Sequence, residues 1–369
     1  MLPPNGGVKE KLGKVSRHWW SMVVKRGLDQ RAKAMPIDDI RRVAWFARSQ
    51  SGSQIFQMPH GEVPLVNAEH KEAVCTVLGL PSPAAMDIVG QEIPSNHPSR
   101  THTVDEDGWS LTNAGGWEGD SRRRDAHDEM EGVMADSLTE GGAPVYRGDG
   151  TKTRLARGLP PGGGRTRFQS EPPRGELLKG IMPDLVVSIG DGDELGDAKG
   201  PSDVWCDVKT LGRRATYLRR GDTQGHAVRT RQREVVDEYV KRAERADNTF
   251  FRNDPSTPFK HMLNGLPRVK GLVFGMFGEW SQDVAQLLKL AAGNLAARWE
   301  ALNGLSAEDA LQACTWDLKR RWSLTALRAN ARVRIECAHH VKYSAAGSQR
   351  APRSVGGTHA GWLARRPRS

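Results

Sequence analysis

The sequence predicts a mixed α/β fold, and three observations support this prediction. Two apolar runs flank an acidic, glycine-rich centre between residues 181 and 211, which is the pattern of a β-hairpin. Apolar residues at helical spacing predict helices over 121–140 and 226–247. The run 268–278 has the composition of a buried strand, and 143–148 that of a short strand. The predicted element order is therefore helix, strand, strand, strand, helix, strand.

The region before these elements is predicted to have two parts. Residues 8–49 carry three tryptophans among many Lys and Arg, and their pattern predicts one or two amphipathic helices. Residues 51–116 are rich in Pro, Gly, Ser and His with weak periodicity, so we expect loop or linker there. The N-terminal region is thus expected to be basic and helical, followed by a linker.

The region after these elements is predicted to be helical. Residues 281–302 and 306–338 each begin at a serine, a preferred N-cap residue, and continue with helical patterning. The last residues contain no Asp or Glu and many Gly, Ser and Pro, so we expect a disordered basic tail. The predicted segments are an N-terminal region, a core, a C-terminal helical region and a tail, over 1–116, 117–280, 281–341 and 342–369.

Composition favours an anionic partner. The 369 residues include 54 Lys and Arg against 44 Asp and Glu, which gives a formal net charge of +10. Nucleic acid is the first expectation and an anionic membrane surface the second, and a charge that serves only solubility is the alternative. No apolar stretch approaches the roughly 18 residues of a membrane span, and the beginning of the chain lacks the apolar core of a signal peptide. Four cysteines without paired spacing favour a reducing compartment. We therefore expect an intracellular protein, cytoplasmic or nuclear, without a membrane partner.

The predicted hairpin gathers charged groups at one end. If "DLVVSI" and "VWCDVK" pair so that Asp184 lies opposite Asp207, the alternate residues of both strands form a wholly apolar face. Lys209 then shares the other face with the two aspartates. A slip by one residue would mix the faces, so the hydrophobic pattern supports this register. Two carboxylates and an amine are therefore expected to converge.

Two adjacent carboxylates repel each other unless a cation lies between them. Mg²⁺ (or Mn²⁺) binds one or two carboxylates together with phosphate and water oxygens. A nearby lysine can orient or deprotonate water, or offset charge on a phosphoryl transition state. The pattern therefore predicts metal-assisted phosphodiester hydrolysis, with Asp184 and Asp207 as metal ligands and Lys209 as the residue that orients water or stabilises charge. The alternative is a charged strand edge with one salt bridge, which protects a sheet from aggregation.

At these residues the chain resembles the PD-(D/E)xK nuclease superfamily. Pro183-Asp184 matches the first part of the motif, and Asp207-Val208-Lys209 matches the second. The resemblance implies a restriction-endonuclease-like α-β-β-β-α-β core, which agrees with the predicted element order, and the C-terminal helices would be an appendage. It also implies an endonuclease-like, Mg²⁺-dependent hydrolase of nucleic acid, with DNA as the expected substrate and RNA as the alternative. The wider arrangement also resembles open reading frames of mobile-element-rich genomes.

The resemblance further implies a metal-binding acid on the first helix of the core. Glu129 is the best candidate because it borders the apolar stripe of 121–140. His127 lies on the same border, where some members of the superfamily carry a histidine. Asp128 and Glu131 are rivals.

A Gln and a Tyr four residues apart occur in the second helix of some members. Here Gln232 is followed by Val236, and Tyr239 comes later, so this motif is not carried over.

Basic residues follow Lys209 closely and lead into the second helix. Arg229, Arg231 and Arg233 are expected to contact the phosphate backbone of the nucleic acid, which gives affinity without reading sequence. Together these observations favour a metal-dependent nuclease. The first alternative is a non-catalytic nucleic-acid-binding protein that retains the nuclease fold, and the second is a structural or interaction protein.

Overall fold

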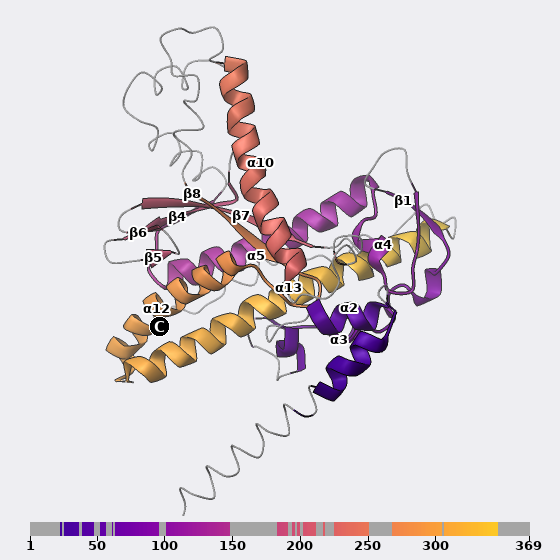
Figure 1. Ribbon diagram of the computed structural model, residues 1–369, viewed down its shortest axis with the longest axis horizontal. Helices are drawn as coiled ribbons and strands as arrows, with labels where there is room; N and C mark the ends of the chain where they lie inside the picture. Colours follow the sequence, from indigo (N-terminus) through magenta and orange to yellow (C-terminus); the bar gives the residue numbers. More distant parts are fainter. Residues whose placement is uncertain are drawn as a thin grey trace, which may run out of the picture.

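The protein has a mixed α/β structure, described here from a computed structural model (Figure 1). The residues that it describes are 23, 26–36, 39–47, 52–56, 61, 63–95, 101–147, 183–190, 194–195, 198–199, 202–211, 217, 225–250, 268–304 and 306–345. Among the helices of these ranges, none is both long enough and apolar enough to cross a membrane.

The main sheet has four strands in the order β3-β4-β7-β8. Their bounds are β3 Val145–Arg147, β4 Leu185–Ile189, β7 Ser202–Thr210 and β8 Arg268–Phe274. The first three strands pair antiparallel, whereas β7 and β8 pair parallel. A parallel pair needs a crossover connection, which here includes helix α10 (His226–Phe250). Helix α5 (Gly116–Glu140) precedes the sheet.

Among the described residues from α5 to β8, the predicted order of helix, strand, strand, strand, helix, strand is confirmed for the main elements. One small hairpin, which the sequence pattern did not predict, lies between β4 and β7. It pairs β5 (Glu194–Leu195) with β6 (Ala198–Lys199). The polar turn predicted between β4 and β7 therefore contains the two short paired strands β5 and β6.

The pairing of β4 with β7 has the predicted register. Leu185 pairs with Cys206 and Val187 with Val204. In the same register Asp184, one residue before β4, lies across from Asp207. The apolar alternation favours this register because a slip by one residue would expose one strand's hydrophobic face.

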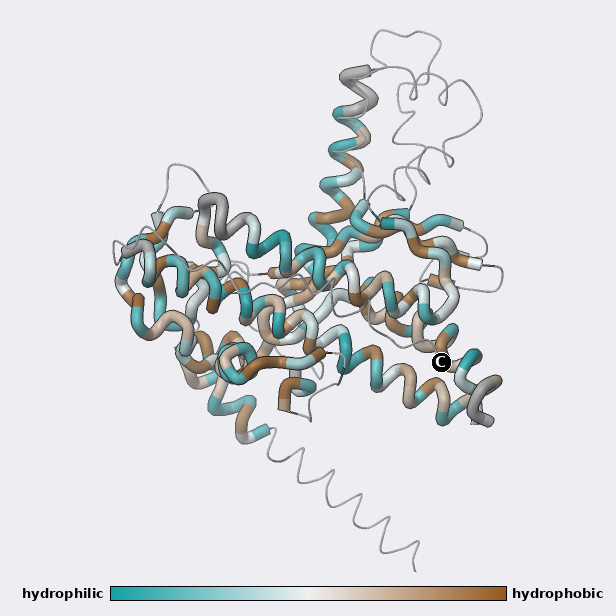
Figure 2. Tube along the Cα trace, turned by 180° about the vertical axis from the view of Figure 1, so that it is seen from behind, coloured by the Kyte–Doolittle hydropathy of each residue, from teal (hydrophilic) through white to brown (hydrophobic). Residues whose placement is uncertain are grey.

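The two faces of the sheet are covered by different helices. On the apolar face the alternate residues of β4 and β7 are buried against α5 and against two C-terminal helices, α12 (Gln282–Asn303) and α13 (Ala307–Ala345). On the other face lies α10. Gly271 of β8 permits the close approach of α10, because a Cβ at this position would lie 3.0 Å from the carbonyl oxygen of Gln232. Figure 2 shows hydrophobic and hydrophilic residues alternating along the helices, as expected when each helix buries one side.

The predicted C-terminal helices are confirmed, with one change at the end. Helix α12 ends at Gly304, whose φ of 64° is the left-handed conformation that favours glycine. Helix α13 then runs back along α12 (Figure 1). It continues to Ala345, beyond the end that its apolar pattern predicted. The first residues of the expected disordered tail, 342–345, are therefore helical. Residues 346–369 lie outside the described residues.

The expectation of loop or linker over 51–116 is wrong for most of this region. It contains η1 (Gly52–Phe56), α3 (Asn67–Leu78), η2 (Met86–Ile88), the paired strands β1 (Glu92–Pro94) and β2 (Thr101–Thr103), and α4 (Trp109–Thr112). Ile55, Val63 and Val77 from this region pack against α13. In the preceding region, 8–49, the described residues include helix α2 (Ile40–Ala47) and helical residues 26–34, as predicted.

Buried charge explains why the sequence of this region looked like a linker. Glu69 and Glu72 lie on the buried side of α3, so that helix shows little apolar periodicity. Glu72 accepts from Arg334 of α13 at 3.1 Å and from the hydroxyl of Ser82 at 2.7 Å. Glu69 pairs with Arg332 of α13. The region is therefore held to α13 partly by ion pairs, which hydrophobic patterning does not reveal.

A buried carboxyl beyond the end of β8 predicts a pH-dependent stability. Glu279 is buried, and its oxygens accept hydrogen bonds from the Tyr217 hydroxyl at 2.6 Å and the Phe277 amide at 3.0 Å. Burial outweighs these hydrogen bonds and raises the pKa of Glu279 to about 7. Between pH 4.5, the ordinary pKa, and about 7, the unfolded state binds fewer protons than the folded state, so the free energy of unfolding falls as pH rises.

We expect Glu279→Gln to remove this fall. Between about pH 4.5 and 7.5, the difference in unfolding free energy between variant and wild type should shift by roughly 3 kcal/mol in favour of the variant. Denaturant unfolding at several pH values measures this difference. Tyr217→Phe removes a hydrogen bond to the carboxylate and should extend the fall to higher pH. Parallel pH profiles for wild type and Glu279→Gln would contradict the prediction.

Candidate active site at one end of the sheet

The structure brings Asp184, Asp207 and Lys209 together at one end of the β4–β7 pair. The Lys209 ammonium nitrogen lies 2.6 Å from Asp207 Oδ2 and 3.8 Å from Asp184 Oδ2. One cation therefore lies beside both carboxylates. Neighbouring strands in the predicted register create this arrangement, because Asp184 lies just before β4 and the other two residues alternate on one face of β7.

Asp184 is held by both backbone and side chain. The Val208 amide donates to Asp184 Oδ2 at 2.7 Å, and His127 Nε2 lies 3.0 Å from the same oxygen. Burial opposes ionisation of this carboxyl, but the His127 hydrogen bond and the charge of Lys209 hold its pKa below the ordinary value. Asp184 is therefore the aspartate that carries negative charge most readily.

Asp207 has the opposite electrostatic character. Its side chain is buried, and it accepts at Oδ1 from the Tyr239 hydroxyl at 2.8 Å. Burial raises the pKa of Asp207, and the nearby Asp184 charge adds to this effect, although Lys209 and Tyr239 act against it. Two interacting carboxyls with pKa values displaced in opposite directions are common in catalytic sites. A cation that binds between them would favour ionisation of both.

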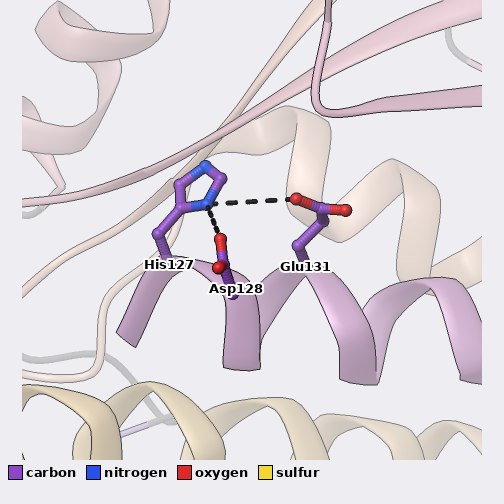
Figure 3. A group of neighbouring side chains, drawn as sticks. All are labelled: His127, Asp128 and Glu131. Carbon is purple, nitrogen blue, oxygen red and sulfur yellow. Dashed lines mark hydrogen bonds and ion pairs between the residues drawn. The ribbon is translucent and has the colours of Figure 1, made fainter. Parts of the chain in front are cut away.

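His127 joins this group from helix α5. Its Nδ1 lies 3.2 Å from Asp128 Oδ1 and 3.9 Å from Glu131 Oε2 (Figure 3). Glu131 is in turn held by Arg147 of β3, whose Nε donates to Glu131 Oε1 at 2.7 Å. Burial disfavours the charged imidazole, but the hydrogen bonds to Asp184 and Asp128 raise the pKa of His127 to about 9. The ring therefore links α5 to the aspartate at the start of β4.

Glu129, the preferred candidate on this helix, does not reach the site. It pairs with Arg328 and, at 3.2 Å, with Arg332, both on α13. Helix α5 packs against both the sheet and α13, and polar residues lie on both sides of its apolar stripe. His127 lies on the side of the sheet, and Glu129 lies on the side of α13. Residues two apart do not face the same way on a helix, so only one of His127 and Glu129 can face the sheet. The expectation that Glu129 lies with the aspartates is therefore wrong, and His127 is the residue of α5 that lies beside Asp184.

Tyr239 is the site residue that the sequence analysis missed. It belongs to the stripe of α10 that faces the sheet, together with Val228, Val235 and Ala243, all of them buried. The expected spacing of four from Gln232 obscured it, since Tyr239 follows seven residues later. The Gln232 side chain accepts from the Gln282 amide at 3.2 Å. The apolar stripe was the signal that could have placed Tyr239 against Asp207.

The arginines of α10 that were expected to bind phosphate differ in their surroundings. Arg231 pairs with Glu234 at 3.0 Å and with Glu238 at 2.6 Å. Arg229 and Arg233 are exposed. Arg213, Arg214, Arg219 and Arg220, which precede them, lie outside the described residues. Arg231 is therefore already engaged within the protein.

The donor set of the site fits a divalent cation. Asp184 and Asp207 lie beside the Lys209 ammonium, and His127 Nε2 lies 3.0 Å from Asp184 Oδ2. Carboxylates with an imidazole suit Mn²⁺ as well as Mg²⁺. His127, Asp128 and Glu131 also lie close enough to one another to hold an ion. That second group is partly exposed, and acidic groups at a surface are common without a metal. The aspartate pair differs from it in that a cation, the Lys209 ammonium, already lies beside both carboxylates.

Replacing His127 and Glu129 separately should distinguish a role at the aspartate site from a role in the contact between α5 and α13. We expect His127→Ala to lower the affinity for Mn²⁺ by about tenfold or more, because an orienting and ligating group is lost. Glu129→Gln should leave metal affinity unchanged and lower the free energy of unfolding by about 1–3 kcal/mol, because two arginines lose a charged partner. Calorimetric titration and denaturant unfolding measure the two quantities. A metal affinity that depends on Glu129 but not on His127 would reverse our assignment.

Comparison of the chain with protein-family models, with curated proteins and with solved structures finds no match. Its function must therefore be inferred from its own residues and their geometry.

Proposed function

We propose that this chain is a metal-dependent nuclease of the PD-(D/E)xK type. The observation that carries the proposal is the convergence of Asp184 and Asp207 on the ammonium of Lys209. The order and directions of β3-β4-β7-β8, with α5 before them and α10 crossing between β7 and β8, support a restriction-endonuclease-like core over 117–280. The C-terminal helices would be an appendage to this core.

The residues that would hold Mg²⁺ or Mn²⁺ are Asp184, Asp207 and His127. A bound divalent ion lowers the pKa of a coordinated water and offsets charge on the phosphoryl oxygens. Binding would require Lys209 to move from between the carboxylates and His127 to present a neutral nitrogen. These requirements make metal binding weaker at low pH.

The chain's own residues would hold the reacting groups in place. Tyr239 donates to Asp207 Oδ1, which leaves Oδ2 directed at the cation position. The Val208 amide donates to Asp184 Oδ2, the oxygen nearest the Lys209 ammonium, and so fixes the orientation of this carboxylate. Lys209, displaced from between the aspartates but still tethered to β7, would orient the attacking water or stabilise the developing phosphoryl charge. The main chain of β7 would thus align both the cation site and the lysine.

The substrate class would be nucleic acid, with DNA preferred. The net charge of +10 and the exposed Arg229 and Arg233 of α10 support an anionic, phosphate-rich partner. A non-catalytic nucleic-acid-binding protein that keeps the nuclease fold is the second candidate. It is favoured by the same 2.6 Å Lys209–Asp207 contact, since an internal ammonium can neutralise the carboxylates without any metal.

Cleavage by the purified wild-type chain tests the proposal. Labelled single- and double-stranded DNA and RNA are incubated with Mg²⁺, Mn²⁺, Ca²⁺ or EDTA. We expect cleavage with Mg²⁺ or Mn²⁺ and none with EDTA. Salt-sensitive binding without cleavage of any substrate would support the second candidate instead.

A further inference from the structure

The two helices that flank the sheet share one arrangement relative to the aspartates. Helix α5 provides His127 to Asp184, and helix α10 provides Tyr239 to Asp207. An arginine lies three residues away on each helix, Arg124 before His127 and Arg242 after Tyr239. Side chains three residues apart occupy the same side of a helix. Each helix therefore carries an arginine on the same side as the residue that holds the aspartate.

Within the described part of the chain, Arg124 is the member of a three-arginine run that has no partner. Arg122 pairs with Glu336 of α13 at 2.8 Å, and Arg123 donates to the carbonyl of Ala114 at 2.5 Å. Arg124 is exposed and forms no ion pair or hydrogen bond with the part of the chain that the structure describes. Its charge is thus available to a ligand at the side of the site that α5 forms.

Arg242 is positioned by an aromatic ring on the other side of the site. Its guanidinium lies 5.3 Å from the centre of the Tyr239 ring, within cation–π range. Its ion pair with Glu238 is long, at 3.6 Å, whereas Glu238 is bound more closely by Arg231 at 2.6 Å. The cation–π contact therefore holds Arg242 beside Tyr239, which binds Asp207. Only the long ion pair with Glu238 restrains the N–H donors of its guanidinium.

We infer that Arg124 and Arg242 bind the phosphates on either side of the phosphodiester that lies at Asp184 and Asp207. Helices α5 and α10 cover opposite faces of the sheet, so Arg124 and Arg242 belong to elements on opposite sides of the β4–β7 pair. A nucleic acid strand carries a charge at each nucleotide, and a guanidinium binds a phosphate through two parallel hydrogen bonds. The inference rests on the proposed function, because the phosphate between the two arginines is the one that would be cleaved.

Binding of fluorescently labelled DNA over a range of salt concentrations, with Ca²⁺ in place of Mg²⁺, tests the inference without turnover. The variants are Arg124→Ala, Arg242→Ala and the double variant. Lys289→Ala is the matched control, since it removes one exposed charge on α12. Each arginine variant should weaken binding about tenfold or more. Each should also reduce the slope of log affinity against log salt by about 0.9 for duplex or 0.7 for single-stranded DNA.

The double variant should lose about twice this slope, and Lys289→Ala should lose none. Unchanged slopes in the arginine variants, or equal losses in Lys289→Ala, would overturn the inference. Cleavage by wild type is measured in parallel with Mg²⁺. If wild type cleaves while the slopes are unchanged, the inference fails and the nuclease proposal stands. If wild type binds but never cleaves, the nuclease proposal fails, while reduced slopes still identify the two arginines as phosphate contacts.

Discussion

Replacing Asp207 by alanine is expected to abolish Mg²⁺- or Mn²⁺-dependent cleavage of nucleic acid. The side chain supplies Oδ2 to the position that Lys209 occupies, 2.6 Å away, and it is the buried one of the two carboxylates. Without it, Asp184 and His127 would remain as the only ligands that we assign to the cation. Binding of nucleic acid should persist and could tighten, because the variant removes a negative charge from a site that attracts a polyanion.

Two further variants separate chemistry from folding in this experiment. Asp207→Asn keeps an oxygen that can accept from the Tyr239 hydroxyl, so its loss of cleavage would reflect the missing charge. Asp237→Ala removes an exposed carboxylate on α10 and should leave cleavage unchanged. Cleavage rate, binding and thermal unfolding are measured for all three variants. Equal cleavage by wild type and Asp207→Ala would show that the activity comes from a contaminating nuclease.

The sheet and its register could be predicted because one physical signal dominates there. Each residue of β4 and β7 alternates between faces, and a shift by one would turn Val187 and Cys206 away from the core. The same pattern located Asp184 opposite Asp207 and put Lys209 on their face. Helices with a wide apolar stripe, such as α10 and α12, were predicted to within a few residues for the same reason.

The N-terminal region and the choice among the acids of α5 could not be predicted this way. Glu72 and Arg334 are buried as an ion pair, and such pairs carry no periodic hydrophobic signal. A stripe border shows that a residue lies beside the core, but not which neighbouring element it faces. Glu129 and His127 both satisfy that criterion, and only the position of α13 separates them.

Lys209→Ala is expected to lower the rate of metal-dependent cleavage by roughly 10²–10⁴-fold, the range for a positioned proton donor or acceptor. The lysine lies beside both aspartates and would compete with the proposed metal for their oxygens. Its removal should therefore leave metal affinity unchanged or increase it, even as the rate falls. Metal titration by calorimetry and single-turnover cleavage under saturating metal measure the two effects separately.

Lys209→Arg is the more discriminating variant, and we expect it not to restore the rate. A planar guanidinium cannot deprotonate water at neutral pH and cannot occupy the compact space that an ammonium fills between Asp184 and Asp207. Lys289→Ala, on the exposed side of α12, controls for the loss of one positive charge and should cleave at the wild-type rate. If arginine at position 209 restored cleavage, the lysine would act only through its charge. If alanine there abolished metal binding as well as cleavage, Lys209 would be a structural part of the cation site rather than a residue that acts on water or phosphate.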